Sequence, residues 1–131
     1  MKSRPQIGEL GELDIPTDAR HAVEFAGNGM PAVLSTPNLV GFLERTARVT
    51  LDPHLEADER SVGIELDLRH LAPTLVGETI HCSARVIACD DRKITFQIEA
   101  RDRHEVILRG LHKRAVIRMA SFSQRVAGKA G

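Results

Sequence analysis

The sequence has no tryptophan, no tyrosine and only four phenylalanines among its 131 residues. Its core must therefore be built from aliphatic side chains, which favours a sheet packed on a helix over a scaffold anchored by aromatic residues. The formal net charge is zero, from 18 acidic and 18 basic residues, so electrostatics gives no reason to expect nucleic acid or an anionic membrane as a partner. The length suits a single domain over residues 1–131, with an ordered core from about 7 to 125.

Long apolar runs and cysteines are scarce as well. No apolar stretch approaches the roughly 20 residues that span a membrane, and the polar N-terminus does not resemble a secretory signal. Cys82 and Cys89 are the only cysteines. They fall in one expected strand, on opposite faces, and cannot pair with each other. We therefore expect a cytoplasmic protein with both thiols reduced.

One long helix is predicted over residues 37–51. Pro37 suits the first helical position and Thr36 suits the N-cap, while Asp52 and Pro53 end the helix. The apolar arc of this helix is wider than a surface helix needs, so we expect it to be covered on more than one side. The arc consists of Leu39, Val40, Phe42, Leu43, Ala47, Val49 and Leu51.

Alternation of apolar and polar residues predicts strands after this helix. Inward-facing positions begin at Val62, Ile80 and Ile94, and a last strand runs from about 106 to 119. Polar turns at 90–92 and 102–104 join the last three strands as hairpins.

The remaining segments are less regular. Residues 7–15 are a candidate opening strand, and residues 20–31 are expected to form a loop with a short helical piece. The cluster Gly27-Asn28-Gly29 in this loop favours irregular backbone. The termini, residues 1–6 and 126–131, are expected to be frayed.

The simplest closure of this order is an α+β domain with the hot-dog fold, an antiparallel sheet of about five strands curled around the one long helix. An α+β sandwich of another topology would have the same order of elements, so both remain open at this point.

Three polar residues could carry chemistry, and each also has an ordinary structural explanation. Glu44, at the edge of the apolar arc, is either an (i, i+4) ion-pair partner of Arg48 or a partly shielded general base. His70 continues the alternation of residues 62–68 onto the apolar face. It is either a buried histidine bonded to a backbone carbonyl or a site residue at the rim of the core. Thr36 is either an N-cap or a hydroxyl directed at a substrate carbonyl.

Other polar groups give weaker signals. No glycine-rich phosphate loop, nucleophile elbow or zinc motif occurs, and the other five histidines lack the spacing of metal ligands, so no metal is expected. The last strand carries a basic run that is either a solvated strand face or a site for phosphates: Arg109, His112, Lys113, Arg114 and Arg118.

The candidate residues fall in segments that resemble the fluoroacetyl-CoA thioesterase family. These segments are residues 30–36 (MPAVLST), 40–44 (VGFLE), 61–63 (SVG) leading to His70, and 110–117 (GLHKRAVI). The resemblance runs from about Ile7 to Arg125, and it is carried by the joint spacing of the segments.

The resemblance implies a homodimeric hot-dog enzyme that hydrolyses an acyl-CoA thioester to the free acid and CoA, with CoA as part of the substrate and no further cofactor. It assigns Thr36, Glu44 and His70 as the catalytic residues, and Gly63 and Arg114 as supporting, substrate-binding positions. Met30, in the segment before Thr36, is a further substrate-binding candidate.

The chain departs from the family in one respect. The fluoroacetate-specific member has phenylalanines in the lid before the catalytic threonine, where this chain has Gly27 and Met30. We therefore expect the family's general chemistry without selectivity for the fluorinated acyl group. A hot-dog enoyl hydratase would need an aspartate and a histidine five residues apart, which the sequence lacks. A non-catalytic acyl-CoA-binding module remains open, because fold alone does not exclude it.

Helix geometry constrains the site. With a rise of 1.5 Å per residue, Thr36 and Glu44 lie about 12 Å apart along the helix axis, too far for a hydrogen bond within one chain. Either the helix begins later than Pro37, or the site joins Thr36 of one protomer to groups of the other. A two-fold dimer would then hold two equivalent composite sites.

Overall fold

The computed structural model describes the whole chain, residues 1–131. Short 3-10 turns cover Ala19–His21, Asp52–His54 and Gly128–Ala130. The principal elements are, in order, β1 (Leu10–Pro16), α1 (Thr36–Leu51), β2 (Glu59–His70), β3 (Thr79–Asp90), β4 (Lys93–Arg101), β5 (Val106–Arg118) and α2 (Met119–Ala127).

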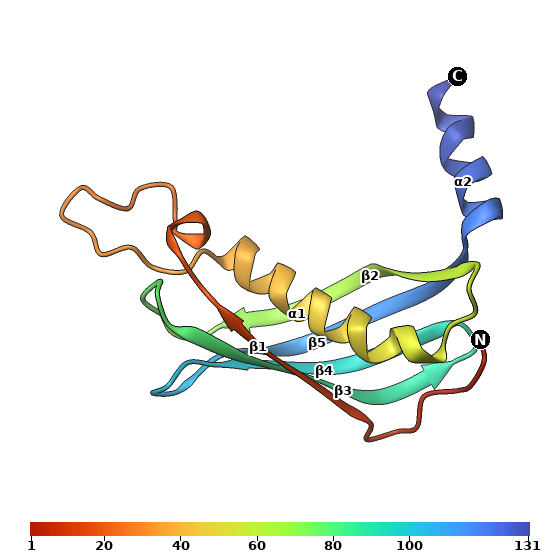
Figure 1. Ribbon diagram of the computed structural model, residues 1–131, viewed down its shortest axis with the longest axis horizontal. Coiled ribbons are helices and arrows are strands. Elements are labelled where there is room, and N and C mark those ends of the chain that lie inside the picture. The colour runs from red at the N-terminus through yellow and green to blue at the C-terminus, as the bar shows by residue number, and fades with distance from the viewer.

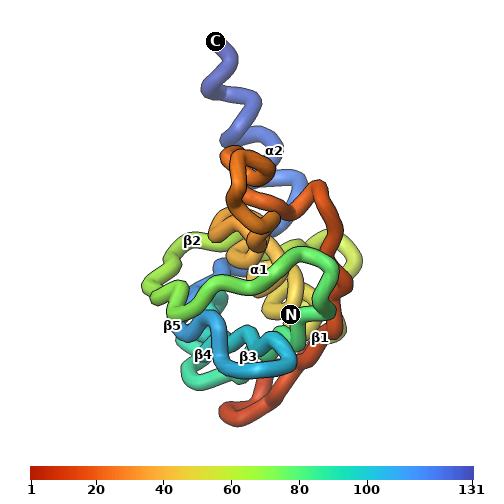
Figure 2. The backbone as a smooth tube through the Cα atoms, turned by 90° about the vertical axis from the view of Figure 1, so that its left-hand side faces the viewer, coloured from red at the N-terminus to blue at the C-terminus, as the bar shows by residue number.

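The five strands form one antiparallel sheet in the order β1-β3-β4-β5-β2. Helix α1 lies across one face of this sheet, and the strands curve beneath it (Figure 1). The view along the molecule shows β1 and β2 as opposite edges on either side of α1 (Figure 2). This arrangement confirms the α+β hot-dog fold and excludes the alternative sandwich.

The core is aliphatic, as the shortage of aromatic residues required. Its 18 buried members include one aromatic side chain, Phe96. Helix α1 contributes Leu39, Leu43, Ala47 and Leu51, a stripe of one residue per turn that faces the sheet. The broader predicted arc is not covered within one protomer: Val49 is 42% exposed.

A β-bulge corrects the predicted facing of β2. The register against β5 shifts between Gly63 and Glu65, and a bulge reverses the faces of the residues on its two sides. Before the shift the buried side chains are Glu59 and Ser61, so Val62 and Ile64 were wrongly placed inward, and Ile64 is 48% exposed. After the shift the predicted phase holds, which puts His70 on the inner side of the sheet.

A second bulge, in β3, corrects the prediction for the cysteines. The register against β4 shifts between Val86 and Ala88, so Ala88 is exposed and Cys89 is turned to the side of Cys82, where it packs against the core. The two cysteines therefore face the same side, not opposite ones. Both are free thiols.

The termini are more ordered than expected. Lys2 donates its backbone N–H to the carbonyl of His54, and the Ser3 hydroxyl lies 2.7 Å from Nδ1 of the same histidine. At the other end, α2 was not predicted; it projects away from the sheet with no buried residue (Figure 1). No helix of the structure has the length and apolar character needed to cross a membrane.

Glu59 is a buried acid at the start of β2 that the sequence did not single out. Hydrogen bonds from the backbone N–H of Glu56, from the Met1 amino group and from Arg92 hold its pKa at about 2. A carboxyl with a lowered pKa stabilises the fold above its unfolded pKa of about 4.3, and this contribution is lost as the pH falls towards 2.

We expect Glu59→Gln to reduce the free energy of unfolding by about 1–3 kcal/mol at neutral pH, because buried donors lose their charged acceptor. Thermal unfolding of parent and variant should give Tm values that converge as the pH is lowered from neutral towards the folded pKa of about 2. The exposed neighbour Glu56, replaced by glutamine, is the control and should leave Tm nearly unchanged. A Tm difference for Glu59→Gln that persists undiminished in acid would contradict this account.

Candidate active site

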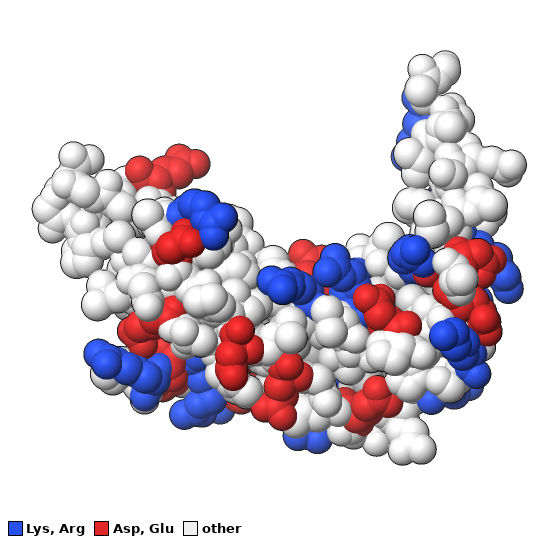
Figure 3. All heavy atoms as spheres, in the orientation of Figure 1, with Lys and Arg blue, Asp and Glu red and all other residues white.

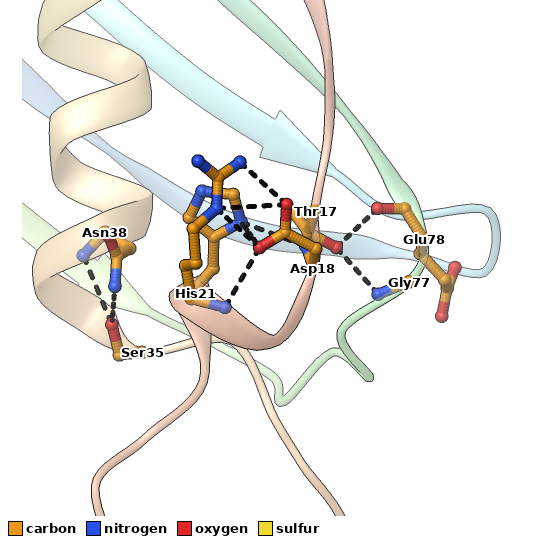
Figure 4. Close-up of polar contacts among 8 residues, drawn as sticks. Thr17, Asp18, His21, Ser35, Asn38, Gly77 and Glu78 are labelled. Carbon is orange, nitrogen blue, oxygen red and sulfur yellow. Dashed lines mark hydrogen bonds and ion pairs between the residues drawn. The ribbon is translucent and has the colours of Figure 1, made fainter.

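Helix α1 begins one residue earlier than predicted, and its N-cap is Ser35 (Figure 4). The Ser35 hydroxyl accepts hydrogen bonds from the backbone N–H of Asn38 at 3.3 Å and from its side-chain amide at 2.7 Å. The prediction that Thr36 caps the helix is therefore wrong. Because Ser35 performs the capping, the hydroxyl of Thr36 is available for another contact.

Hydrogen bonds hold the segment between β1 and α1 in two places. Thr17, at the end of β1, donates its hydroxyl hydrogen to the carbonyl of Glu78 and accepts from the N–H of Gly77 (Figure 4). Further along, Val23 donates to the carbonyl of Val33 and so closes the neck of a loop that contains Gly27 and Gly29, both with positive φ. The irregular backbone predicted at these glycines is confirmed, and the start of α1 has a defined position over the sheet.

Thr36 and His70 come together at this end of the helix. The Thr36 hydroxyl oxygen lies 2.8 Å from Nδ1 of His70. The other ring nitrogen, Nε2, is buried and has no hydrogen-bond partner in the protomer. The ordinary explanation for His70, a ring satisfied by a backbone carbonyl, therefore does not hold. The pair, which we call the Thr36–His70 pair, lies at the N-terminus of α1, where the helix dipole favours negative charge.

Glu44 lies in a second group, two turns further along α1. Its carboxylate is about 40% exposed and forms an ion pair with Arg114 of β5 at 3.8 Å; it forms none with Arg48. A Cβ on Gly63 of β2 would lie 2.6 Å from this carboxylate and 3.1 Å from the ring of His112. We call Glu44, Ser61, Gly63, His112 and Arg114 the Arg114 cluster.

The structure thus brings the candidate residues together in two places. The helix begins at Thr36, so a later start cannot close the separation of about 12 Å between Thr36 and Glu44. Within one protomer, Thr36 meets His70, and Glu44 meets Gly63 and Arg114. Met30 lies apart from both groups, 45% exposed on the loop before α1, and its substrate-binding role remains a prediction.

The basic run of β5 divides between the two faces of the strand. Arg109, Lys113 and Arg118 form surface ion pairs with acids of neighbouring segments, as expected for a solvated face. His112 and Arg114 are 1% and 5% exposed on the inner face, so the solvated-face interpretation is wrong for these two residues, and the substrate-binding role of Arg114 stays a prediction. The pattern of charges did not distinguish these two residues from their neighbours, because the strand is basic on both faces; only the family resemblance singled out Arg114.

Two hollows differ in their relation to these residues. The larger, of about 770 Å³, lies on the outer face of the sheet; it is lined by Arg109 of the basic run but by neither the Thr36–His70 pair nor the Arg114 cluster. The smaller, of about 220 Å³, lies beside the middle of α1, where basic side chains gather in Figure 3. It is lined by Gly41, Glu44, Arg45, Arg48 and Arg114. Glu44 therefore faces open space large enough for part of a ligand, surrounded by guanidinium groups.

The close approach at Gly63 leads to a testable expectation. In Gly63→Ala the added methyl would displace the end of the Glu44 side chain rather than backbone, so we expect little change in Tm. Because a misplacement of about 1 Å can cost 10²-fold in rate, turnover should fall by about 10–100-fold. Gly128→Ala, where a Cβ meets nothing within 4 Å, is the matched control. Parental turnover in Gly63→Ala would show that the position of this carboxylate is unimportant.

Comparison with known proteins agrees with the fold and identifies the family. A family model described as fluoroacetyl-CoA-specific thioesterase matches residues 17–120. The fluoroacetyl-CoA thioesterase of Streptantibioticus cattleyicolor is 31% identical over 137 residues, which cover 98% of this chain and 97% of the relative.

Solved structures extend the agreement. A crystal structure of a phenylalanine-to-alanine variant of the fluoroacetyl-CoA-specific thioesterase has a TM-score of 0.90 at 29% identity, covering 98% of this chain and 99% of the other. A hot-dog-like protein from Thermanaerovibrio acidaminovorans has a TM-score of 0.86 at 21% identity, covering 95% and 93% of the two chains, and supports the fold alone.

The fold and these similarities define an acyl-CoA thioesterase of the hot-dog class. More narrowly, the chain belongs to the fluoroacetyl-CoA-specific thioesterase family.

Proposed function

We propose that the Thr36–His70 pair is the site of thioester hydrolysis and that Glu44 reaches it from the partner subunit. The observation that carries this proposal is the hydroxyl–imidazole contact of 2.8 Å beside a buried Nε2 without a partner. Such a pair at a helix N-terminus suits a carbonyl oxygen that becomes negatively charged during the reaction.

Each residue has a distinct part in this proposal. His70 donates from Nδ1 to the Thr36 oxygen, which directs the Thr36 hydroxyl hydrogen to the thioester carbonyl. Glu44 accepts a proton from a water molecule while the oxygen of that water bonds to the carbonyl carbon of the thioester. When the tetrahedral intermediate collapses, the carbon–sulfur bond breaks and that proton passes to the CoA thiolate. The products are the free acid and CoA.

The edge strand β2 supports a dimer. It leaves one side of the sheet unpaired and carries Ile64 and Leu66, which are 48% and 44% exposed. A two-fold axis near Leu66, midway between Gly63 and His70, would pair two β2 edges in antiparallel fashion. His70 of one protomer would then lie opposite Gly63 of its partner, next to the partner's Glu44. We infer a homodimer with two such composite sites.

The acyl group is the least constrained part of the substrate. The loop before α1 offers Met30 and glycines near its tip and no phenylalanine at those positions, so we propose that the enzyme does not select for the fluoroacetyl group. We place it in the cytoplasm, with no cofactor beyond the CoA of its substrate.

A released-thiol assay tests these proposals with acetyl-, fluoroacetyl-, isobutyryl- and benzoyl-CoA as substrates. Thiol release from several of them, with kcat/KM for fluoroacetyl-CoA and acetyl-CoA within about 10²-fold, is the expected result. A preference for fluoroacetyl-CoA well above that ratio would contradict the selectivity proposal. Tight binding of all four without thiol release would contradict hydrolysis. Mass spectrometry of enzyme quenched during a single turnover should show no acylated protein, because water attacks directly.

A further inference from the structure

Arg114 is held by more contacts than an ion-pair partner of Glu44 needs. Its Nε donates to the Ser61 hydroxyl at 2.8 Å, and its Nη2 donates to the Ser61 carbonyl at 2.9 Å. Its Nη1 lies 3.1 Å from Nε2 of His112 and 3.8 Å from the Glu44 carboxylate. A guanidinium has five N–H groups in a rigid plane, so these contacts determine both its position and its rotation.

The contacts of His112 fix its protonation state. Its Nδ1 lies 3.0 Å from the carbonyl oxygen of Glu65, which can only accept, so Nδ1 carries the ring proton. Its Nε2 is then a bare acceptor for the N–H of Arg114. Burial lowers the pKa of His112, and although the Glu65 carbonyl and Glu44 act in the opposite sense, the guanidinium of Arg114 reinforces the lowering. A second proton on this ring, at Nε2, would make the imidazole positive and remove the acceptor that Arg114 uses.

We propose that His112 is a positioning residue for hydrolysis: as a neutral acceptor it rotates Arg114 so that an N–H of Nη1 faces Glu44. The Glu44 carboxylate lies 3.8 Å from this guanidinium and close to the bare Cα of Gly63. The inference rests on the proposed role of Glu44 and adds a residue that contacts neither the acyl group nor the water.

Three variants separate the two contacts of the ring. In His112→Gln, the longer side chain can place an amide oxygen near the former Nε2 and accept from Arg114. In His112→Asn, the shorter side chain can reach only the Glu65 carbonyl. In His112→Leu, neither contact remains. We expect His112→Gln to retain most of the kcat, and the other two to lose about 10–100-fold in kcat with KM changed much less.

A double variant distinguishes action through Arg114 from a purely structural role, because only the former predicts kcat losses that do not add. If His112 acts through Arg114, the double variant His112→Leu/Arg114→Lys should be no slower than Arg114→Lys alone. His104→Leu, at an exposed histidine, is the matched control and should keep parental kinetics. Tm values for each variant identify any loss of folding, and the contrast between glutamine and asparagine decides the question if His112→Leu does not fold.

Two results would overturn the inference. One is equal kcat in His112→Gln and His112→Asn, and the other is additive losses in the double variant. Glu44→Gln, measured in parallel, separates the two levels of the proposal. If Glu44→Gln is as active as the parent, the proposed function fails and the inference fails with it. If Glu44→Gln is inactive but the His112 variants are normal, the inference alone is wrong.

Discussion

Glu44→Gln is expected to lower kcat for acyl-CoA hydrolysis by about 10²–10⁴-fold, because the amide cannot accept the proton of the attacking water. The substitution keeps the size of the side chain at a position about 40% exposed, so Tm should change little. Steady-state kinetics by thiol release, with Tm as the check on folding, measures the effect. The control is Glu24→Gln, at an exposed acid of the loop before α1. Turnover at the parental rate in Glu44→Gln would remove this residue from the mechanism.

A site shared between two subunits also predicts that a mixture of two inactive variants recovers activity. In a heterodimer of Glu44→Gln and Thr36→Ala subunits, one site contains intact Thr36 and intact Glu44 from different chains, and the other contains neither. Random pairing of two inactive variants would make half of the dimers hybrid, so the mixture should recover about a quarter of the parental activity. If each site were complete within one chain, refolded mixtures would remain inactive. Sedimentation analysis of the parent should show a dimer, and a monomer with full activity would exclude the composite site.

Thr36→Ala is expected to reduce kcat by about 10²–10³-fold, the usual loss when one donor to a developing oxyanion is removed. Thr36→Ser keeps the hydroxyl within reach of His70 and should retain most of the activity. Thr36→Val keeps the shape of the side chain without the hydroxyl, and should be as slow as the alanine variant. The same released-thiol assay compares the three.

The neighbouring hydroxyl is the matched control. Ser35 caps α1, so Ser35→Ala should lower the free energy of unfolding by about 1 kcal/mol with a much smaller effect on kcat. Thr36→Ala should show the reverse, with a large effect on kcat and a small one on Tm. If the two substitutions exchanged these effects, Thr36 would be the structural hydroxyl and the assignment would be wrong.

The hot-dog fold could be predicted from the sequence because its signals are local or periodic. Pro37 and Asp52-Pro53 bracket α1 to within one residue of its observed bounds, and alternation from Ile80 and from Ile94 locates the two central strands. Both strands are buried on one face, so a period of two is imprinted on their residues. The bulges in β2 and β3 escaped prediction, because an extra residue in a strand has no local signature and appears only as a register shift against a neighbour.

For the site, the sequence indicated the candidate residues but not the contacts that they make. A serine and a threonine in succession offered two possible N-caps, and only the helix geometry shows that Ser35 takes that role and leaves Thr36 to His70. Glu44 could be placed on α1, but the expected partner Arg48 was chosen by sequence spacing, whereas the actual partner Arg114 comes from a strand 70 residues further along the chain.

The sequence by itself determined an aliphatic core, one helix over a sheet, and a resemblance that named the family. It also placed Thr36 and Glu44 too far apart on one helix to meet. Tertiary structure alone decided that Thr36 pairs with His70 and that Glu44 joins Gly63, His112 and Arg114. Those contacts join segments remote in sequence, and their distances depend on strand register, bulges and the path of the helix over the sheet, which a one-dimensional pattern does not encode.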